Sequence, residues 1–207
     1  MEELIIQIIV DIVTQYADIV REWKEEFSDI RYYNLRKLQI CDVVEDSNFY
    51  DYTQAFRTFV DEKYQKITFM HNNGLLTSAR VTNRVKSIRS MDDKIRRYNS
   101  GNLHGKMKVN KCLNDIVGFR IILGDNLNRI QIANLLSDKY SSTREQSFRI
   151  TEASKNGYYA THVYFKVDNS CFPCEIQLWN MEDAKQNIKM HFSYKEDYTI
   201  DIKKGSE

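Results

Sequence analysis

The sequence has few of the residues that interrupt a chain, and it lacks any segment that would anchor it in a membrane. One proline and seven glycines among 207 residues leave few breaks and no flexible linker. The apolar run at 5–13 is interrupted by Gln7 and Asp11, which excludes a membrane span. The N-terminus has neither the basic start nor the small-residue cleavage site of a signal peptide. We therefore predict a cytoplasmic protein without a membrane partner, built as one domain or as one domain with an added helical piece.

The sequence also has almost no excess of positive over negative charge. The formal net charge is +1, so any contact with a nucleotide or a nucleic acid must come from a local cluster of cations. Cysteines number four, and a cytoplasmic protein keeps such thiols reduced. The pair in Cys171-Phe172-Pro173-Cys174 has no second pair at zinc-binding spacing, so a turn is favoured there over a zinc site.

What is present is a helical pattern followed by a strand pattern. Apolar spacing predicts helices at 3–26, 49–70 and 76–98, and mainly loop at 29–48 with room for a short helix at 32–38. The apolar stripe of 3–26 is expected to pack on the domain rather than to serve a partner chain. β-branched runs predict strands at 116–123, 149–151, 160–167 and 175–179, with helices at 127–138 and 181–195. This order predicts an α+β fold with a mixed or antiparallel sheet.

A run of cations at 84–97 reads RVKSIRSMDDKIRR. The polar positions that recur every fourth residue are Lys86, Ser90 and Lys94. On a helix this spacing places two ammonium groups and a hydroxyl in one row. Together with Arg84 such a row can grip a polyphosphate, because ammonium groups act as point charges and a guanidinium binds bidentately or stacks on a base. The alternative is an ordinary solvated helix face whose cations pair with Asp92 and Asp93.

Two carboxylates stand at the starts of predicted strands. Asp115 precedes the apolar strand at 116–123 and Glu175 begins the strand at 175–179, so both can reach a cleft and share one Mg²⁺. Alternatively, Asp115 is a common turn residue. Arg120 lies inside an apolar strand, where its charge needs a partner or access to the surface.

Two further groups of residues suggest a cleft on the same sheet. Strand alternation places Glu175, Gln177 and Trp179 on one face. Gly157 permits a close approach of the backbone to a ligand, and the adjacent Tyr158 can stack on a base, unless the segment is a plain turn followed by a strand.

The order of these motifs resembles the synthetase domain of the RelA/SpoT family. The motifs are Arg84-x-Lys86-x3-Ser90-x3-Lys94, Asp115-Ile116-x-Gly118-x-Arg120, Gly157-Tyr158-x3-His162, Glu175-x-Gln177 and His191-x2-Tyr194-Lys195. The resemblance implies a mixed sheet flanked by helices, related to nucleotidyltransferase palms. It also implies transfer of the β,γ-pyrophosphate of ATP to a ribose 3′-hydroxyl, which leaves AMP.

The resemblance further implies a role for each matched residue. The ATP-binding residues would be Arg84, Lys86, Ser90, Lys94 and Arg120, with the two arginines sandwiching the adenine. Asp115 and Glu175 would be catalytic and would hold Mg²⁺, and Glu175 could help to deprotonate the 3′-hydroxyl. The acceptor-binding residues would be Tyr158, stacked on the acceptor base, with His162, Gln177, His191 and Lys195.

The chain divides on this reading into a helical N-terminal extension at 1–75, a synthetase domain at 76–195 and a polar tail at 196–207. It contains no His-Asp dipeptide. The metal hydrolase domain of the long family members is therefore expected to be absent.

Three departures from the family pattern fall on the acceptor side. The family usually continues Glu-x-Gln with Ile-Arg-Thr, whereas this chain has Leu178-Trp179-Asn180. Met190 stands where a Glu usually precedes the histidine, and Lys155 lies one position closer to Tyr158 than the usual lysine. Such departures, with a helical N-terminal extension, resemble the toxic small alarmone synthetases. Some of these pyrophosphorylate the 3′-CCA end of tRNA, others make alarmones or their adenosine analogues, and a cognate antitoxin protein is then a partner.

The acceptor stays open between tRNA, which we slightly favour, and the guanosine nucleotides GDP and GTP, which would give (p)ppGpp. A tRNA needs a basic patch for its backbone. The candidates are Arg31, Arg36, Lys37, Lys63, Lys66, Arg144 and Arg149, which are otherwise ordinary surface charges. A non-catalytic RNA-binding or antitoxin-binding module is the third alternative, and the presence of both carboxylates weighs against it.

Overall fold

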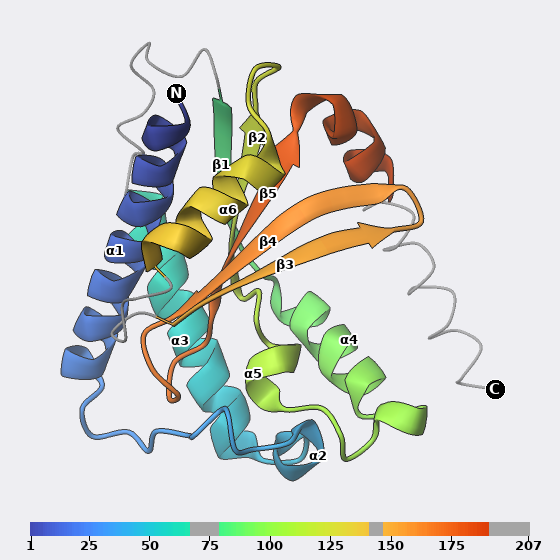
Figure 1. Cartoon of the computed structure of the whole chain (residues 1–207). Coiled ribbons are helices and arrows are strands. Elements are labelled where there is room, and N and C mark those ends of the chain that lie inside the picture. Colours follow the sequence, from blue (N-terminus) through green and yellow to red (C-terminus); the bar gives the residue numbers. More distant parts are fainter. Residues whose placement is uncertain (67–78, 141–146, 191–207) are drawn as a thin grey trace.

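A mixed five-stranded sheet forms the centre of the computed structural model, which describes residues 1–66, 79–140 and 147–190 (Figure 1). The strands are β1 (Ala79–Val85), β2 (Val117–Leu123), β3 (Ser147–Lys155), β4 (Tyr158–Lys166) and β5 (Cys174–Asn180). The helices are α1 (Glu2–Glu26), α2 (Ile40–Val43), α3 (Ser47–Lys66), α4 (Ile88–Tyr98), α5 (Val109–Cys112) and α6 (Arg129–Tyr140), with a 3₁₀ turn at Gly101–Leu103 and a further helix at 181–190. The predicted α+β fold with a helical N-terminal extension is confirmed.

The strand order is β1-β2-β5-β4-β3. The central pair, β2 and β5, is parallel, and the other neighbours are antiparallel. Because the crossover from β2 to β5 passes through α6 and the β3–β4 hairpin, residues far apart in the sequence stand side by side at the centre. The parallel register places Gly118 beside Glu175 and Arg120 beside Gln177.

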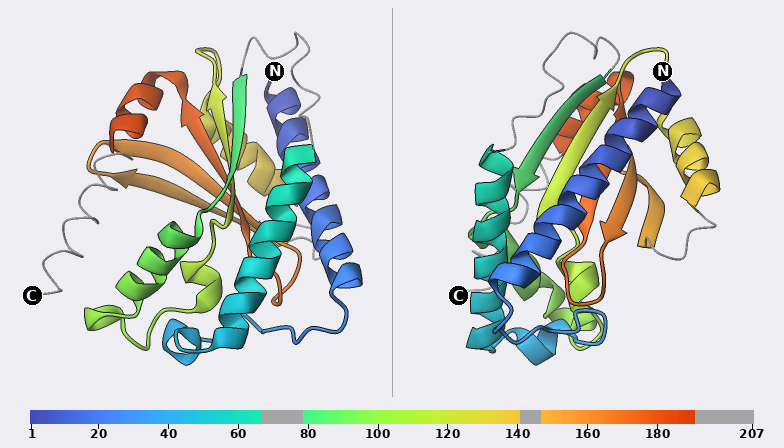
Figure 2. Two further views of the ribbon diagram at one scale, coloured as in Figure 1. Left: turned by 180° about the vertical axis from the view of Figure 1, so that it is seen from behind. Right: turned by 90° about the vertical axis from the view of Figure 1, so that its left-hand side faces the viewer.

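One face of the sheet is covered by α1, α3 and α6. Figure 2 shows α1 crossing this face between the other two helices. The stripe of α1 is buried as expected, through Ile5, Ile9, Ile12, Tyr16 and other residues that join the core of the sheet. The N-terminal helices are therefore part of the main core and are not an appendage.

The other face carries α4 and α5 toward one end and the helix at 181–190 toward the other (Figure 1). Alternation along the strands sends Arg84, Arg120, His162, Glu175 and Gln177 to this less covered face. Any site built from them lies between the two groups of helices.

The predicted helix at 76–98 is wrong over Ala79–Val85, which form strand β1, and its first three residues lie outside the described part of the chain. This segment pairs with β2 along its whole length, from Ala79↔Leu123 to Val85↔Val117. Helix α4 begins only after Ser87, whose side chain accepts a hydrogen bond from the backbone of Ser90 as an N-cap. Lys86 consequently does not lie on the helix of Ser90 and Lys94.

The short helix expected at 32–38 is also misplaced. That segment contains a turn, and the helix follows at Ile40–Val43, where Gln39 and Asp42 form a capping box. The predicted strands are confirmed, although β3 is longer than the expected 149–151. The last four residues of the helix predicted at 49–70 and the last five of that at 181–195 lie outside the described residues. Within the described segments, no helix combines the length and the apolar character needed to cross a bilayer.

Candidate active site

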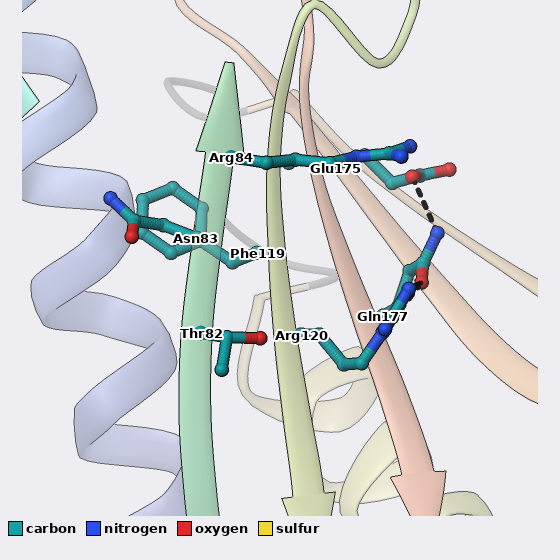
Figure 3. Close-up of a pocket in the computed structure, with 8 residues that line it drawn as sticks. Thr82, Asn83, Arg84, Phe119, Arg120, Glu175 and Gln177 are labelled. Carbon is teal, nitrogen blue, oxygen red and sulfur yellow. Dashed lines mark hydrogen bonds between the residues drawn. The ribbon is translucent and has the colours of Figure 1, made fainter. Parts of the chain in front are cut away.

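A cleft of about 180 Å³ opens on the less covered face of the sheet, over β1, β2 and β5 (Figure 3). Its lining residues are Thr82, Asn83, Arg84, Gly118, Phe119, Arg120, Glu175 and Gln177. In the close-up, Arg84 and Arg120 extend from β1 and β2 toward β5, where Glu175 and Gln177 lie. Four of the predicted site residues are thus gathered in one cavity.

Gly118 lets the Arg84 side chain cross β2. The two residues are cross-strand partners, and a methyl group added to Gly118 would already lie 3.5 Å from the Arg84 Nε. A larger side chain at this position would displace the arginine. The glycine of the Asp115-Ile116-x-Gly118-x-Arg120 motif therefore leaves room for the guanidinium, and a methyl group there would make an ordinary van der Waals contact with it.

Asp115 forms ion pairs with three cations at one edge of the cleft. Its Oδ2 accepts a hydrogen bond from Lys86 Nζ at 2.6 Å and its Oδ1 one from Lys94 Nζ at 2.9 Å, while Arg84 Nη2 lies 3.7 Å from Oδ2. Burial alone would raise the pKa of Asp115, but the ammonium groups of Lys94 and Lys86 hold it well below its ordinary value. Three cations against one carboxylate leave a positive surplus that suits a polyphosphate.

Lys86 and Lys94 reach Asp115 from two different elements. Lys86 directly follows β1, and its backbone N–H donates to the Ile116 carbonyl at 2.8 Å, which continues the β1–β2 ladder. Arg57 of α3 donates to the Lys86 carbonyl, also at 2.8 Å. Lys94 comes from α4 and also donates to Asn114 at 3.0 Å. The predicted convergence of the two lysines is present, but tertiary packing produces it and not a single helical row.

Ser90, the third member of the predicted row, lies in the first turn of α4. Its backbone N–H donates to the Ser87 Oγ at 3.3 Å and its hydroxyl accepts from that same group at 3.0 Å. The structure therefore gives Ser90 a part in capping α4, and the hydroxyl stands near the positive end of the helix dipole.

Arg120, which lies in an apolar strand, is partnered by Trp179 and Gln177. Its guanidinium carbon lies 3.7 Å from the centre of the Trp179 ring, and Nη2 and Nε donate to Gln177 Oε1 at 3.3 and 3.4 Å. Burial and the nearby charge of Arg84 lower the pKa of Arg120, which nevertheless stays charged at neutral pH. Trp179 is fully buried and packs on Ala160 and Ala184, so it forms a rigid platform under the arginine.

Glu175 is a buried and hydrogen-bonded carboxylate. Its Oε1 accepts from the Tyr164 hydroxyl at 3.0 Å and lies 3.2 Å from His162 Nδ1, and its Oε2 accepts from Gln177 Nε2 at 2.8 Å. Burial raises the pKa of Glu175, but the contact with His162 and the hydrogen bond from Gln177 outweigh it and leave the pKa below its ordinary value. The side chain is therefore ionised at neutral pH and can accept a proton.

Tyr158 and His162 stand beside this carboxylate on β4. The Tyr158 hydroxyl is 3.0 Å from His162 Nε2, and the Tyr158 ring meets the His162 and Trp179 rings edge-on at 6.0 Å. Burial raises the pKa of Tyr158 to about 12. This tyrosine is neutral at physiological pH and presents an aromatic group next to the cleft.

Two residues of this region were missed from the sequence. Tyr164 was not singled out, although the alternation of β4 places it on the same face as Tyr158 and His162. Asn114, which binds Lys94, gives no signal that separates it from an ordinary turn residue.

Several predicted site residues lie outside the described part of the chain. These are His191 and Lys195 of the acceptor set and Arg144 of the RNA patch, together with the side chain of Lys66.

The remaining basic candidates lie on α3, on β3 and in the connection between α1 and α2. Arg31 lies over the Tyr33 ring, Lys63 of α3 pairs with Glu22 of α1, and Arg149 is exposed on β3 opposite Tyr164. Arg36 and Lys37 are exposed on the segment before α2, where Lys108 donates to the Lys37 carbonyl at 2.8 Å. Among the described residues, positions 36–37 form a basic segment and Arg149 lies apart from it on β3. No contact within the described part of the chain joins the two.

The donor groups of the cleft fit a magnesium ion. Mg²⁺ takes one or two carboxylates and completes its shell with phosphate oxygens and water. Asp115 and Glu175 are both buried, and the charge of Asp115 opposes the net lowering of the Glu175 pKa, so a cation bound by both carboxylates would relieve this repulsion. Among the described residues no group of three or more metal-binding side chains occurs, so a substrate would have to supply further ligands.

Comparison with known proteins gives a family match. A family model described as "Region found in RelA / SpoT proteins" matches residues 83–199, more than half of the chain. None of the curated proteins matches significantly. Among solved structures, the chain is similar to small alarmone synthetase 1 from Bacillus subtilis, with 18% identity over 74% of this chain and 82% of that one and a TM-score of 0.43. A structure of the same protein bound to AMPCPP gives 21% identity over 71% of this chain and 76% of the other, with a TM-score of 0.36.

Proposed function

This chain belongs to the RelA/SpoT family, and we propose that it is an ATP-dependent 3′-pyrophosphokinase. The observation that carries this proposal is the convergence of Arg84, Lys86 and Lys94 on Asp115, beside the ionised Glu175. Pyrophosphoryl transfer needs cations for the polyphosphate and a base for the attacking hydroxyl, and this cleft offers both. The contacts of these side chains therefore support the activity that the order of the motifs predicts.

ATP would bind with its adenine between Arg84 and Arg120 and its phosphates toward Lys86, Ser90 and Lys94. The two arginines project from neighbouring strands, Arg84 opposite Gly118 and Arg120 two residues further along β2, and each guanidinium can stack on a base. On arrival of the phosphates, the two lysines would exchange part of their contact with Asp115 for phosphate oxygens. This exchange would leave the Asp115 carboxylate available to a metal ion.

The transfer step follows from these positions. Glu175 takes the proton of the ribose 3′-hydroxyl, and the 3′-oxygen forms a bond to the β-phosphorus of ATP. The bond between that phosphorus and the bridging oxygen to the α-phosphate breaks, and its electrons leave with AMP. Mg²⁺ held by Asp115 and Glu175 would neutralise negative charge on the transferred group. Lys86 and Lys94 stabilise the same charge from the protein side.

For the acceptor we propose the 3′-CCA end of tRNA, which would make the protein a translation-blocking toxin with a cognate antitoxin as partner. The position where the family usually carries a cation is occupied by Trp179, and the surface of this tryptophan is taken by Arg120. A terminal ribose of RNA carries a single bridging phosphate on its 5′ side, whereas GDP and GTP bring a highly charged 5′ end. The lost cation therefore favours the acceptor with less phosphate charge. Tyr158 would stack on the terminal base, and Arg31, Arg149 and the segment at 36–37 are the exposed candidates for the RNA backbone.

The competing acceptor is a guanosine nucleotide, and a parallel assay separates the two. The protein is incubated with Mg²⁺ and ATP labelled in the γ-phosphate, and it is offered GDP, GTP, ATP or deacylated tRNA. Label on the tRNA 3′ end is the expected result. Label on GDP or GTP would make the protein a (p)ppGpp synthetase, and label on no acceptor would favour a non-catalytic RNA-binding or antitoxin-binding module.

A further inference from the structure

Tyr164 is the cross-strand partner of Glu175. The two residues face each other on β4 and β5, and the Tyr164 hydroxyl donates to Glu175 Oε1 at 3.0 Å. Tyr164 is half-buried, and burial together with the negative Glu175 raises its pKa. It is therefore a neutral phenol whose single proton is directed at the carboxylate.

The hydrogen bonds on this strand have one consistent direction. An ionised carboxylate can only accept, so the Tyr164 proton goes to Glu175 and the Tyr164 oxygen is left as an acceptor. His162 Nδ1 lies 3.1 Å from that oxygen, and its Nε2 lies 3.0 Å from the Tyr158 hydroxyl. With the proton on Nδ1, His162 donates toward Tyr164 and accepts from Tyr158. Three residues on one face of β4 thus form a chain of donors that ends on the carboxylate.

The carboxylate is held at both oxygens. Gln177 fixes Oε2 at 2.8 Å and Tyr164 fixes Oε1 at 3.0 Å, with His162 Nδ1 at 3.2 Å from Oε1. The last torsion of a glutamate side chain is otherwise broad, so without the phenol the carboxylate could rotate about it. Gln177 is itself held by Arg120, which ties this orientation to the ATP side of the cleft.

We propose that Tyr164 is a positioning residue for the transfer reaction: its hydroxyl fixes the orientation of the Glu175 carboxylate and of the His162 ring. This inference rests on the proposed function, in which Glu175 accepts the proton of the acceptor hydroxyl. The hydrogen bonds of the Tyr164 hydroxyl go to Glu175 and His162, so we expect its main contribution on the reacting side of the cleft.

The test is the variant Tyr164→Phe, which keeps the ring and removes only the hydroxyl. We expect kcat and kcat/KM to fall together by about 10- to 100-fold, as for other groups that orient a functional ligand, with unchanged KM for ATP and for the acceptor. The matched control is Tyr159→Phe, because Tyr159 lies on the same strand with an exposed side chain. This control should retain wild-type turnover.

Two measurements separate positioning from a general loss of structure. The melting temperature and the affinity for AMPCPP of Tyr164→Phe should equal those of the wild type. Wild-type kcat in the variant, or a loss that appears as a raised KM for ATP, would overturn the inference while leaving the proposed function intact. Absence of labelled product from the wild-type protein with every acceptor would overturn both.

Discussion

At the scale of single residues, Asp115 determines the electrostatics of the cleft. It is buried and receives Lys86, Lys94 and Arg84, so one negative charge keeps three positive ones in place. A protein without this carboxylate would have to bury like charges next to one another, which is unfavourable in a site of low dielectric constant. The site is therefore prepared for an anion before any substrate arrives.

Replacing Asp115 by Asn should reduce pyrophosphate transfer by roughly a hundredfold or more, the cost of removing one preorganised charge from a reacting centre. The variant should also melt at a lower temperature than the wild type, because Lys86 and Lys94 lose their buried partner. Added pyrophosphate should restore more of the melting temperature in the variant than in the wild type. The control Asp125→Asn changes an exposed carboxylate in the turn after β2 and should alter none of these values. Normal turnover of Asp115→Asn would remove this residue from the site.

Lys94 should contribute to the binding of ATP before the chemical step. Lys94→Met removes an ammonium group that would contact a phosphate oxygen, and such charge-assisted bonds contribute about 1.5–3 kcal/mol, or roughly 10- to 100-fold in affinity. The binding of AMPCPP, followed by calorimetry, gives the change directly. Lys111→Met provides the comparison, since Lys111 is exposed on α5. Equal affinities of the two variants would contradict the role of Lys94 in phosphate binding.

At the scale of secondary-structure elements, the helix at 181–190 supplies hydrogen bonds to the part of β4 that β5 does not reach. β5 pairs with β4 only as far as Thr161. Beyond that point the buried Asn187 side chain accepts from the Tyr159 N–H at 2.9 Å and donates to the Tyr159 carbonyl at 2.7 Å. The helix is thereby attached to the start of β4, next to Tyr158.

Asn187→Ala should loosen this end of the cleft. It leaves the two backbone groups of Tyr159 without a partner, at a cost of about 1–3 kcal/mol for each buried group that stays unsatisfied. The melting temperature should fall, and the KM for the acceptor should rise more than the KM for ATP. Lys185→Ala, a change of an exposed side chain on the same helix, should leave both constants as in the wild type. An unchanged acceptor KM in Asn187→Ala would show that the helix does not shape that side.

The limits of sequence-based prediction are also clearest for the elements. Strand β2 could be predicted because Ile116-Val117 and Ile121-Ile122 leave few alternatives to a buried strand. Strand β1 could not be predicted, because Lys86, Ser90 and Lys94 repeat at helical spacing. This repeat masks the alternation of side chains typical of a strand in the residues before Ser87. The chemical types in the site were predicted from the motifs, whereas the contacts of Tyr164 and Asn187 arise from the pairing of distant elements, which local spacing does not encode.

At the scale of the whole molecule, the N-terminal helices hold the loop between β4 and β5, which leads into Glu175. The Tyr16 hydroxyl donates to the Phe172 carbonyl, and the Tyr52 hydroxyl donates to the Ser170 carbonyl at 2.6 Å. Lys24 of α1 forms an ion pair with Asp168 of the same loop. Through these contacts the extension supports the position of β5, which carries Glu175, even though the division of the chain at residue 75 stays a prediction.

The Lys24–Asp168 pair should make stability depend on pH in the acid range. Partial burial raises the pKa of Asp168, but hydrogen bonds from Lys24 and Ser170 outweigh it and lower the pKa to about 2. A carboxylate with a depressed folded-state pKa stabilises the fold above its unfolded pKa, near 3.9, and this contribution is lost as the pH falls toward about 2. The gap in unfolding free energy between wild type and Asp168→Asn should therefore be constant above pH 5 and narrow below about pH 4. The gap should be small and salt-sensitive, because the pair is partly exposed.

Denaturant unfolding at several pH values measures this gap. Asp29→Asn, in the exposed segment after α1, should follow the wild type at every pH. A gap for Asp168→Asn that does not change between neutral and acid conditions would contradict the ionic contribution of this pair.

The most direct test of the central claim follows both transferred phosphates. The protein is given Mg²⁺, an acceptor and ATP labelled either at the β- or at the γ-phosphate, and the nucleotide product is identified. A pyrophosphokinase moves both labels to the acceptor and releases AMP in equal amount, because the bond between the α- and β-phosphates breaks. Transfer of the γ-label alone, with release of ADP, would instead mean an ordinary phosphotransferase and would contradict the role assigned to this cleft.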